Sequence, residues 1–218
     1  MIAISAAEGY ELWADTWDAT PSPIVAVEER TLSPWIEDLP AGRVLDVGCG
    51  TGRRCACLNA IGLDASPAML GVAARKPGLR GRLAVADATS LPIADACCAA
   101  AICALTLGHV RDRNTALREL ARILQPGGTL LLTDFHPAAA AAGWRRTFRR
   151  DGIVYDLENY PHTIEELQAA APALALQQRL DATIGEPERG LFERAGKPEL
   201  FERSIRIPVV QLSRWARI

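Results

Sequence analysis

The chain has 218 residues, enough for one domain with a full α/β core and small additions. Its 24 basic residues nearly balance its 26 acidic residues, which gives no general attraction to nucleic acid or to an anionic membrane. The first residues lack the basic and apolar regions of a secretion signal, and no apolar run reaches the roughly 18 residues of a membrane span. We therefore expect a cytoplasmic protein without a nucleic-acid or membrane partner.

All six cysteines lie between positions 49 and 103, among alanines in apolar segments. A secreted disulfide scaffold would spread its cysteines through polar loops, so the pattern favours reduced thiols that fill the core. Zinc is the alternative, but Cys55 and Cys57 are separated by a single residue, which is less than zinc motifs use.

Short apolar segments alternate with helical patterns from residue 41 onward. Strands are expected at 43–47, 60–64, 82–86, 98–107 and 129–135, and two final strands at 174–184 and 205–218. A helix should begin at Ser66-Pro67, another should cover 112–124, and Thr163 with Glu166 forms a capping box for a third. This alternation indicates a parallel sheet with right-handed crossovers.

Residues 44–52 read VLDVGCGTG, a buried strand followed by Gly48, Gly50 and Gly52. Glycines there let the backbone approach a ligand closely, and the amides of a loop that enters a helix can hold a carboxylate. Asp64 ends the next strand 12 residues after Gly52, where an acid can accept both hydroxyls of a ribose. The stretch predicts a nucleotide-type ligand at the carboxyl edge of the sheet.

A nicotinamide-dependent oxidoreductase would begin in a similar way. Counted from Gly50 and Gly52, however, the third glycine of the dinucleotide fingerprint falls on Cys55. This alternative rests only on the glycine loop and Asp64.

Four further stretches occur in a characteristic order, at 10–18, 87–95, 105–110 and 120–130. Together with the glycine loop they resemble the class I S-adenosylmethionine-dependent methyltransferases, in the branch with small-molecule and quinone-type acceptors. The resemblance is good over residues 10–136 and holds only in outline beyond them. It implies S-adenosylmethionine as cofactor, S-adenosylhomocysteine as its product, and a small-molecule methyl acceptor as the partner.

The resemblance also implies a fold and its divisions. The fold is a Rossmann-like, doubly wound α/β domain with a seven-stranded, mostly parallel sheet. Residues 1–40 would form a helical lid, 41–136 the cofactor-binding core, 137–162 an insertion on the substrate side, and 163–218 the last strands.

Roles for single residues follow from the same resemblance. The three loop glycines, Gly48, Gly50 and Gly52, would line the methionine part of the cofactor, with Asp46 organising the loop and the cofactor's amino group. Asp64 would hold the ribose hydroxyls.

Four more residues would complete the cofactor site. Asp87 would accept from the adenine amino group, and Ala88 would offer its backbone amide to the ring. Leu105 would lie beside the sulfonium, and Tyr10 would cap the methionine end from the lid.

An oxygen or nitrogen acceptor often needs a base, and histidine titrates near neutral pH. His109 follows the fourth strand and His136 follows the fifth, both at the edge where ligands bind. His136 shares a strand face with Asp134, so the two could form an acid–base pair or a structural one. His162 is a third possibility.

Two features leave alternatives open. The interval between Gly52 and Asp64 is shorter than in typical relatives by more than a helical turn, so the helix over 53–59 is trimmed. That motivates the alternative of a catalytically degenerate protein with a binding or regulatory role. The run at 144–150 holds four arginines, which suit an anionic substrate, nucleic acid or simply a solvated surface.

Overall fold

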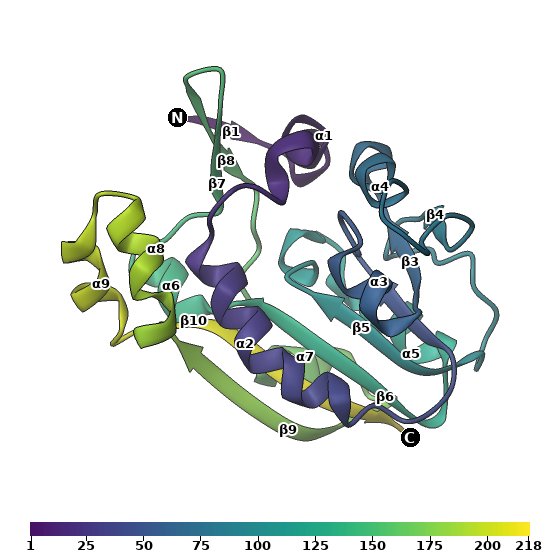
Figure 1. Cartoon of the computed structure of the whole chain (residues 1–218). Helices are drawn as coiled ribbons and strands as arrows, with labels where there is room; N and C mark the ends of the chain where they lie inside the picture. Colours follow the sequence, from purple (N-terminus) through teal and green to yellow (C-terminus); the bar gives the residue numbers. More distant parts are fainter.

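A computed structural model describes residues 1–218 and is built around a seven-stranded sheet (Figure 1). Its strands are β2 (Val44–Val47), β3 (Ile61–Asp64), β4 (Leu83–Val85), β5 (Cys98–Ala104), β6 (Leu124–Phe135), β9 (Leu174–Thr183) and β10 (Pro208–Arg217). The order is β4-β3-β2-β5-β6-β10-β9, and all pairings from β4 to β6 are parallel. Strand β10 runs antiparallel to both of its neighbours, β6 and β9. The predicted mostly parallel sheet is confirmed.

Local capping sequences set the starts and ends of the connecting helices. Ser66 accepts the amide of Met69 at 3.1 Å and starts α4 (Pro67–Ala73). Thr163 and Glu166 form the predicted capping box of α7 (Ile164–Ala170). The trimmed helix α3 (Arg53–Leu58) ends at Asn59 in the left-handed conformation, which asparagine tolerates well.

Side-chain alternation along the central strands gives the sheet two apolar faces. In β5, Ala101 and Cys103 pack in the cluster that includes α5 (Arg113–Ile123) and α7. Ile102 and Ala104 pack in the opposite cluster, which includes α2 (Pro23–Glu37). Figure 1 shows α2 lying across one face of the sheet, with α5 and α7 on the other. The sheet is therefore doubly wound, as predicted.

A second, three-stranded sheet joins the N-terminus to the insertion. It has the order β1-β8-β7, from β1 (Ile2–Ile4), β8 (Ile153–Leu157) and β7 (Thr147–Arg150). Helix α1 (Ala6–Trp17) packs against it, with Trp13 and Phe148 stacked at 4.7 Å between ring centroids. The sequence predicted neither this sheet nor the strand β1. Phe148 and Tyr155 of the insertion thus pack against α1.

Two other parts of the chain differ from the predictions. Between β9 and β10 the chain forms α8 (Arg189–Arg194) and α9 (Pro198–Ser204), and the short α6 (Pro137–Ala141) follows β6. Four cysteines are buried as expected, but Cys57 is exposed and Cys97 partly so. No helix combines the length and apolar character needed to span a bilayer.

Candidate functional site

A cavity of about 380 Å³ lies at the carboxyl ends of β2, β3, β4 and β5, beneath α1. Its size suits a small-molecule site, and it lies where the strand order reverses between β2 and β5. It is lined by eight of the eleven predicted site residues: Tyr10, Gly48, Gly50, Asp64, Asp87, Ala88, Leu105 and His109. Asp46, Gly52 and His136 are not among its lining residues.

Gly48 begins the loop that forms the floor of the cavity. Its φ is +74°, and a Cβ there would overlap the side chain of Thr106. Gly52 also has a φ of +74°, but a Cβ there would meet Leu79 at 2.6 Å, so Gly52 serves packing behind the loop. At both positions the positive φ and the neighbouring side chain leave no room for a Cβ, so both need glycine.

Gly48→Ala is expected to lower the free energy of unfolding by about 2–4 kcal/mol, because a strained φ and a steric clash combine. Gly127→Ala is the matched control, since its φ is +76° with open space around the added Cβ. It should cost only about 1 kcal/mol. Urea unfolding measures both, and equal losses would contradict the steric argument.

The loop amides are already used within the protein. The amides of Gly48 and Cys49 donate to the Leu63 carbonyl at 2.7 and 3.0 Å, and the Gly50 amide donates to Asp64 at 2.7 Å. The sequence suggested that such amides could hold a carboxylate. One of the three does so within the protein, since the Gly50 amide holds the Asp64 carboxylate, and all three fix the loop against β3, which shapes the cavity floor.

Asp64 is held by the backbone on both carboxylate oxygens. Oδ2 accepts from the Gly50 amide at 2.7 Å, and Oδ1 accepts from the Ser66 amide at 2.8 Å. Burial raises the pKa of Asp64, and these backbone hydrogen bonds oppose that shift. A carboxylate oxygen can accept more than one hydrogen bond, so the fixed side chain can still receive two hydroxyls from the cavity.

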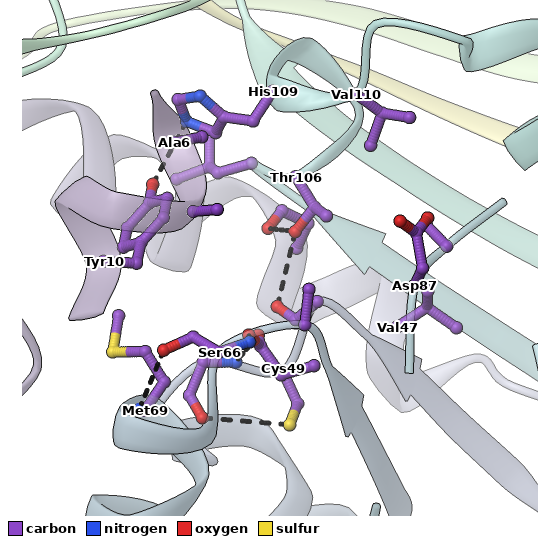
Figure 2. Close-up of a pocket in the computed structure, with 18 of the residues that line it drawn as sticks. Ala6, Tyr10, Val47, Cys49, Ser66, Met69, Asp87, Thr106, His109 and Val110 are labelled. Carbon is purple, nitrogen blue, oxygen red and sulfur yellow. Dashed lines mark hydrogen bonds between the residues drawn. The ribbon is translucent and has the colours of Figure 1, made fainter. Parts of the chain in front are cut away.

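Asp87 lies on the opposite side of the cavity from Tyr10 and His109, as Figure 2 shows. Its Oδ1 accepts both the amide and the hydroxyl of Thr89 at 2.7 Å, whereas Oδ2 has no partner in the protein. Beside it, Ala88 is buried and adds apolar surface. This side of the cavity thus offers one oriented acceptor next to a small apolar wall.

Asp46 lies behind the loop rather than in the cavity. It is almost fully buried, and its Oδ2 lies 3.4 Å from the Cys55 thiol while Oδ1 has no partner. Burial raises the pKa of Asp46, and the charge of Arg54 opposes that shift. Its position supports a role in holding the loop, with no direct contact to the cavity.

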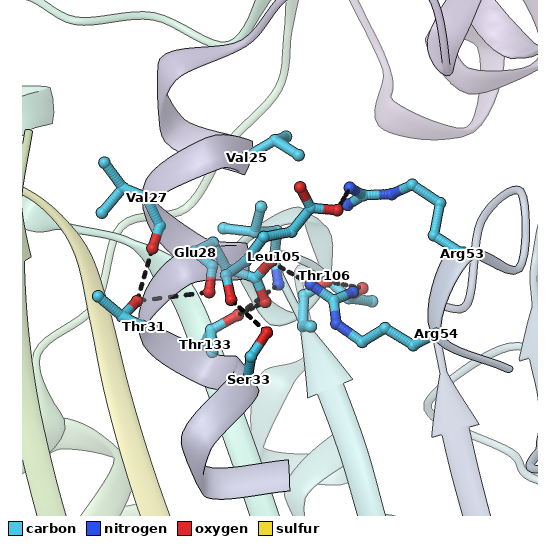
Figure 3. Close-up of polar contacts among 12 residues, drawn as sticks. Val25, Val27, Glu28, Thr31, Ser33, Arg53, Arg54, Leu105, Thr106 and Thr133 are labelled. Carbon is cyan, nitrogen blue, oxygen red and sulfur yellow. Dashed lines mark hydrogen bonds and ion pairs between the residues drawn. The ribbon is translucent and has the colours of Figure 1, made fainter. Parts of the chain in front are cut away.

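Leu105 lines the cavity in a strained left-handed conformation with φ +54°. Its amide donates to the carbonyl and the hydroxyl of Thr133, at 2.8 and 3.2 Å. Thr133 in turn donates to Glu28 at 3.1 Å, and the other oxygen of Glu28 pairs with Arg54, as Figure 3 shows. A buried polar network therefore fixes the Leu105 backbone.

Tyr10 and His109 form one hydrogen-bonded unit with the insertion. The Tyr10 hydroxyl lies 3.1 Å from His109 Nε2 (Figure 2). On the other side of the ring, His109 Nδ1 lies 2.7 Å from the Glu158 carbonyl. Because a carbonyl only accepts, Nδ1 carries the proton, and Nε2 accepts from the tyrosine. Burial, helped by the charge of Arg146, lowers the pKa of His109 to about 4. The imidazole is therefore neutral at pH 7.

This low pKa predicts a pH-dependent stability. The unfolded chain, with an ordinary histidine pKa, binds a proton that the folded protein excludes, so stability falls as pH drops from about 6.5 towards 4. Between about pH 6.5 and 4 the free energy of unfolding should decrease in both the unsubstituted protein and His109→Asn. The decrease should be about 2–3 kcal/mol smaller in His109→Asn, which lacks the titrating group. Urea unfolding at several pH values measures the difference. Parallel pH profiles for the two proteins would contradict it.

His136 is placed away from the cavity. Its Nδ1 accepts the Ala138 amide at 3.0 Å and caps α6, and its Nε2 lies 3.4 Å from Asp181. Asp134 instead accepts the Gly108 amide and lies 3.8 Å from His162. The structure does not bring Asp134 and His136 together as an acid–base pair.

Comparison with known proteins agrees with these features. A family model described as a methyltransferase domain matches residues 45–132. A ubiquinone/menaquinone biosynthesis C-methyltransferase of Syntrophotalea carbinolica is 33% identical over 161 residues, which are 64% of this chain and 68% of that protein. The methyltransferase GfsG of Streptomyces halstedii is 32% identical over 72% of this chain, and the match spans only 63% of that protein.

A solved structure shows the same fold. It is an S-adenosylmethionine-dependent methyltransferase from Mesorhizobium loti, with a TM-score of 0.68 and 22% identity, covering 90% of this chain and all of that one. Sequence relatives, fold and cavity agree with one another. This chain belongs to the class I S-adenosylmethionine-dependent methyltransferase family.

Proposed function

We propose that the cavity beneath α1 is where this protein transfers the methyl group of S-adenosylmethionine to a small-molecule acceptor. The observation that carries the proposal is the fixed carboxylate of Asp64, which two backbone amides orient at the cavity wall beside the glycine loop. A ribose with two neighbouring hydroxyls is the group that such a carboxylate fits. The six unpaired thiols support placing the reaction in the cytoplasm.

The other lining residues fit the rest of the cofactor. Asp87, with its free Oδ2, would receive the adenine amino group, and the wall at Ala88 would contact the ring. Gly48 and Gly50 would leave room for the methionine part, and Leu105 would flank the sulfur. Asp46 would act only by holding the loop from behind.

The bound cofactor supplies a methyl group on a positively charged sulfur, and the chain supplies position. Tyr10, expected at the methionine end of the cofactor, and His109 would form the wall where the methionine part meets the acceptor, and His109 holds the phenol in place. A group with a pKa of about 4 is a weak base at neutral pH. We therefore assign His109 to positioning, and to proton removal only from an acceptor that is itself acidic.

The trimmed helix α3 motivated the alternative of a degenerate, non-catalytic protein. Despite its six residues, α3 leaves Asp64 within 2.7 Å of the Gly50 amide. This contact supports an intact cofactor site and favours the enzyme.

Turnover distinguishes the two functions. The purified protein is incubated with methyl-labelled S-adenosylmethionine and a panel of phenols, quinols, amines and carboxylic acids, and labelled products are counted. We expect transfer to at least one acceptor class, and loss of transfer in Asp64→Asn. Cofactor binding without transfer to any class would favour the non-catalytic function.

A further inference from the structure

One arginine of the run at 144–150 is unlike the others. Arg146 is only 7% exposed and lines the cavity, between α6 and β7. Arg145 is exposed and pairs with Asp156 at 3.3 Å, whereas Arg149 and Arg150 donate to backbone carbonyls near the surface. No acidic side chain lies within ion-pair distance of Arg146. The run therefore places a buried cation without an acidic partner at the wall of the site, beside the Tyr10 hydroxyl.

The other cations that line the cavity are neutralised by the protein. Arg53 pairs with Glu29 and Arg54 with Glu28, while Arg111 is exposed and lies 4.0 Å from Glu158. Burying a charge without a partner is costly, so a buried and unpaired guanidinium points to a partner outside the chain.

Arg146 lies on the side of the cavity that Tyr10 and His109 form. Its charge contributes to the lowered pKa of His109. At Tyr10, burial raises the pKa of the phenol, and the charge of Arg146 opposes that rise. The proposed function puts Tyr10 and His109 at the acceptor end, and Arg146 lies beside them. Asp64 and Asp87 come from β3 and from the chain just after β4, where the cofactor contacts gather.

The acids of the neighbouring segments make other contacts, and none of them forms an ion pair with Arg146. Asp134 accepts two backbone amides, Asp156 pairs with Arg145, and Glu158 accepts from Tyr160. The guanidinium fork matches the two oxygens of a carboxylate.

We propose that Arg146 binds a carboxylate group of the methyl acceptor, so that this protein methylates a small carboxylic acid. The inference rests on the proposed function and narrows its substrate class. Tyr10 and His109 then flank the bound acid, and Arg146 sets which acceptors enter.

The test uses matched ligands on the protein saturated with S-adenosylhomocysteine. Small aromatic and aliphatic carboxylic acids and their neutral primary amides are titrated calorimetrically into the unsubstituted protein, Arg146→Gln and Arg145→Gln. We expect one or more acids to bind at least about tenfold more tightly than the matching amide. Arg146→Gln should abolish this preference, and the exposed control Arg145→Gln should keep it.

Binding of S-adenosylhomocysteine by each variant separates the possible failures. We expect its affinity to be unchanged in Arg146→Gln, which also shows that the variant is folded. A loss of that affinity would mean that Arg146 holds the cofactor's own carboxylate, and would overturn the inference. The inference would also be overturned if amides bound as tightly as the matching acids, or if no acid bound to the protein saturated with S-adenosylhomocysteine. No S-adenosylhomocysteine binding by the unsubstituted protein would instead overturn the proposed function.

Discussion

Asp64→Asn is expected to weaken S-adenosylhomocysteine binding by about 100-fold, because the amide keeps one accepting oxygen and so loses about one of the two charged hydrogen bonds to the ribose, worth about 1.5–3 kcal/mol. The amide also presents an NH₂ group to one of the backbone donors, the amides of Gly50 and Ser66, that the carboxylate now accepts. The substitution thus removes ribose contacts and loosens the loop. Calorimetric titration measures the change in affinity.

Asp151→Asn is the control for this substitution. Its side chain is 89% exposed in the turn between β7 and β8, where φ is +49° and asparagine is well tolerated. Its affinity should equal that of the unsubstituted protein. Unchanged binding by Asp64→Asn would show that Asp64 does not contact the ribose.

Glu28→Ala is expected to lower the free energy of unfolding by about 3 kcal/mol, the cost of breaking a buried ion pair from one side. Glu28 is fully buried between Arg54 and Thr133, so its removal leaves the Arg54 guanidinium without its ion-pair partner and the Thr133 hydroxyl without an acceptor (Figure 3). Since Thr133 holds the amide of Leu105, cofactor affinity should fall as well. Urea unfolding and calorimetry measure the two effects.

The neighbouring Glu29→Ala separates burial from charge. Glu29 pairs with Arg53 in the same way, but its side chain is 53% exposed. Exposed ion pairs contribute at most about 1 kcal/mol, so its loss should be small. Equal destabilisation by the two substitutions would contradict the role given to the buried network.

The parts of the site that the sequence predicted are those encoded locally. A buried strand, a glycine loop and an acid at the end of the next strand lie within residues 44–64, and the structure brings Gly48, Gly50 and Asp64 to one cavity. Capping sequences were equally local, as Thr163 and Glu166 show. Periodicity and capping depend on neighbours in the chain, which is why these features can be read from sequence.

The parts that were missed depend on distant contacts. Glu28 resembles a solvated helix residue until Thr133, more than a hundred residues away, covers it. Arg146 resembles its exposed neighbours until α1 and His109 enclose it. The second sheet needs the parallel pairing of β1 with β8, which has no local sequence pattern.

His136 carries a local capping signal that predicts its place better than its position after a strand does. The proline after it is typical of the first position of a helix, which makes His136 an N-cap. The capping role accounts for its Nδ1, and Asp181 lies near its Nε2, so the structure gives it neighbours outside the cavity. Its position after a strand was a weaker guide than its position before Pro137.

A crystal structure of the protein with S-adenosylhomocysteine tests the central claim most directly. We expect the ligand in the cavity beneath α1, with its ribose hydroxyls on Asp64, its adenine amino group at Asp87 and its sulfur beside Leu105. Arg146 should stay free of the ligand's carboxylate. A ligand bound elsewhere, or lying in the cavity with its ribose away from Asp64, would contradict the account.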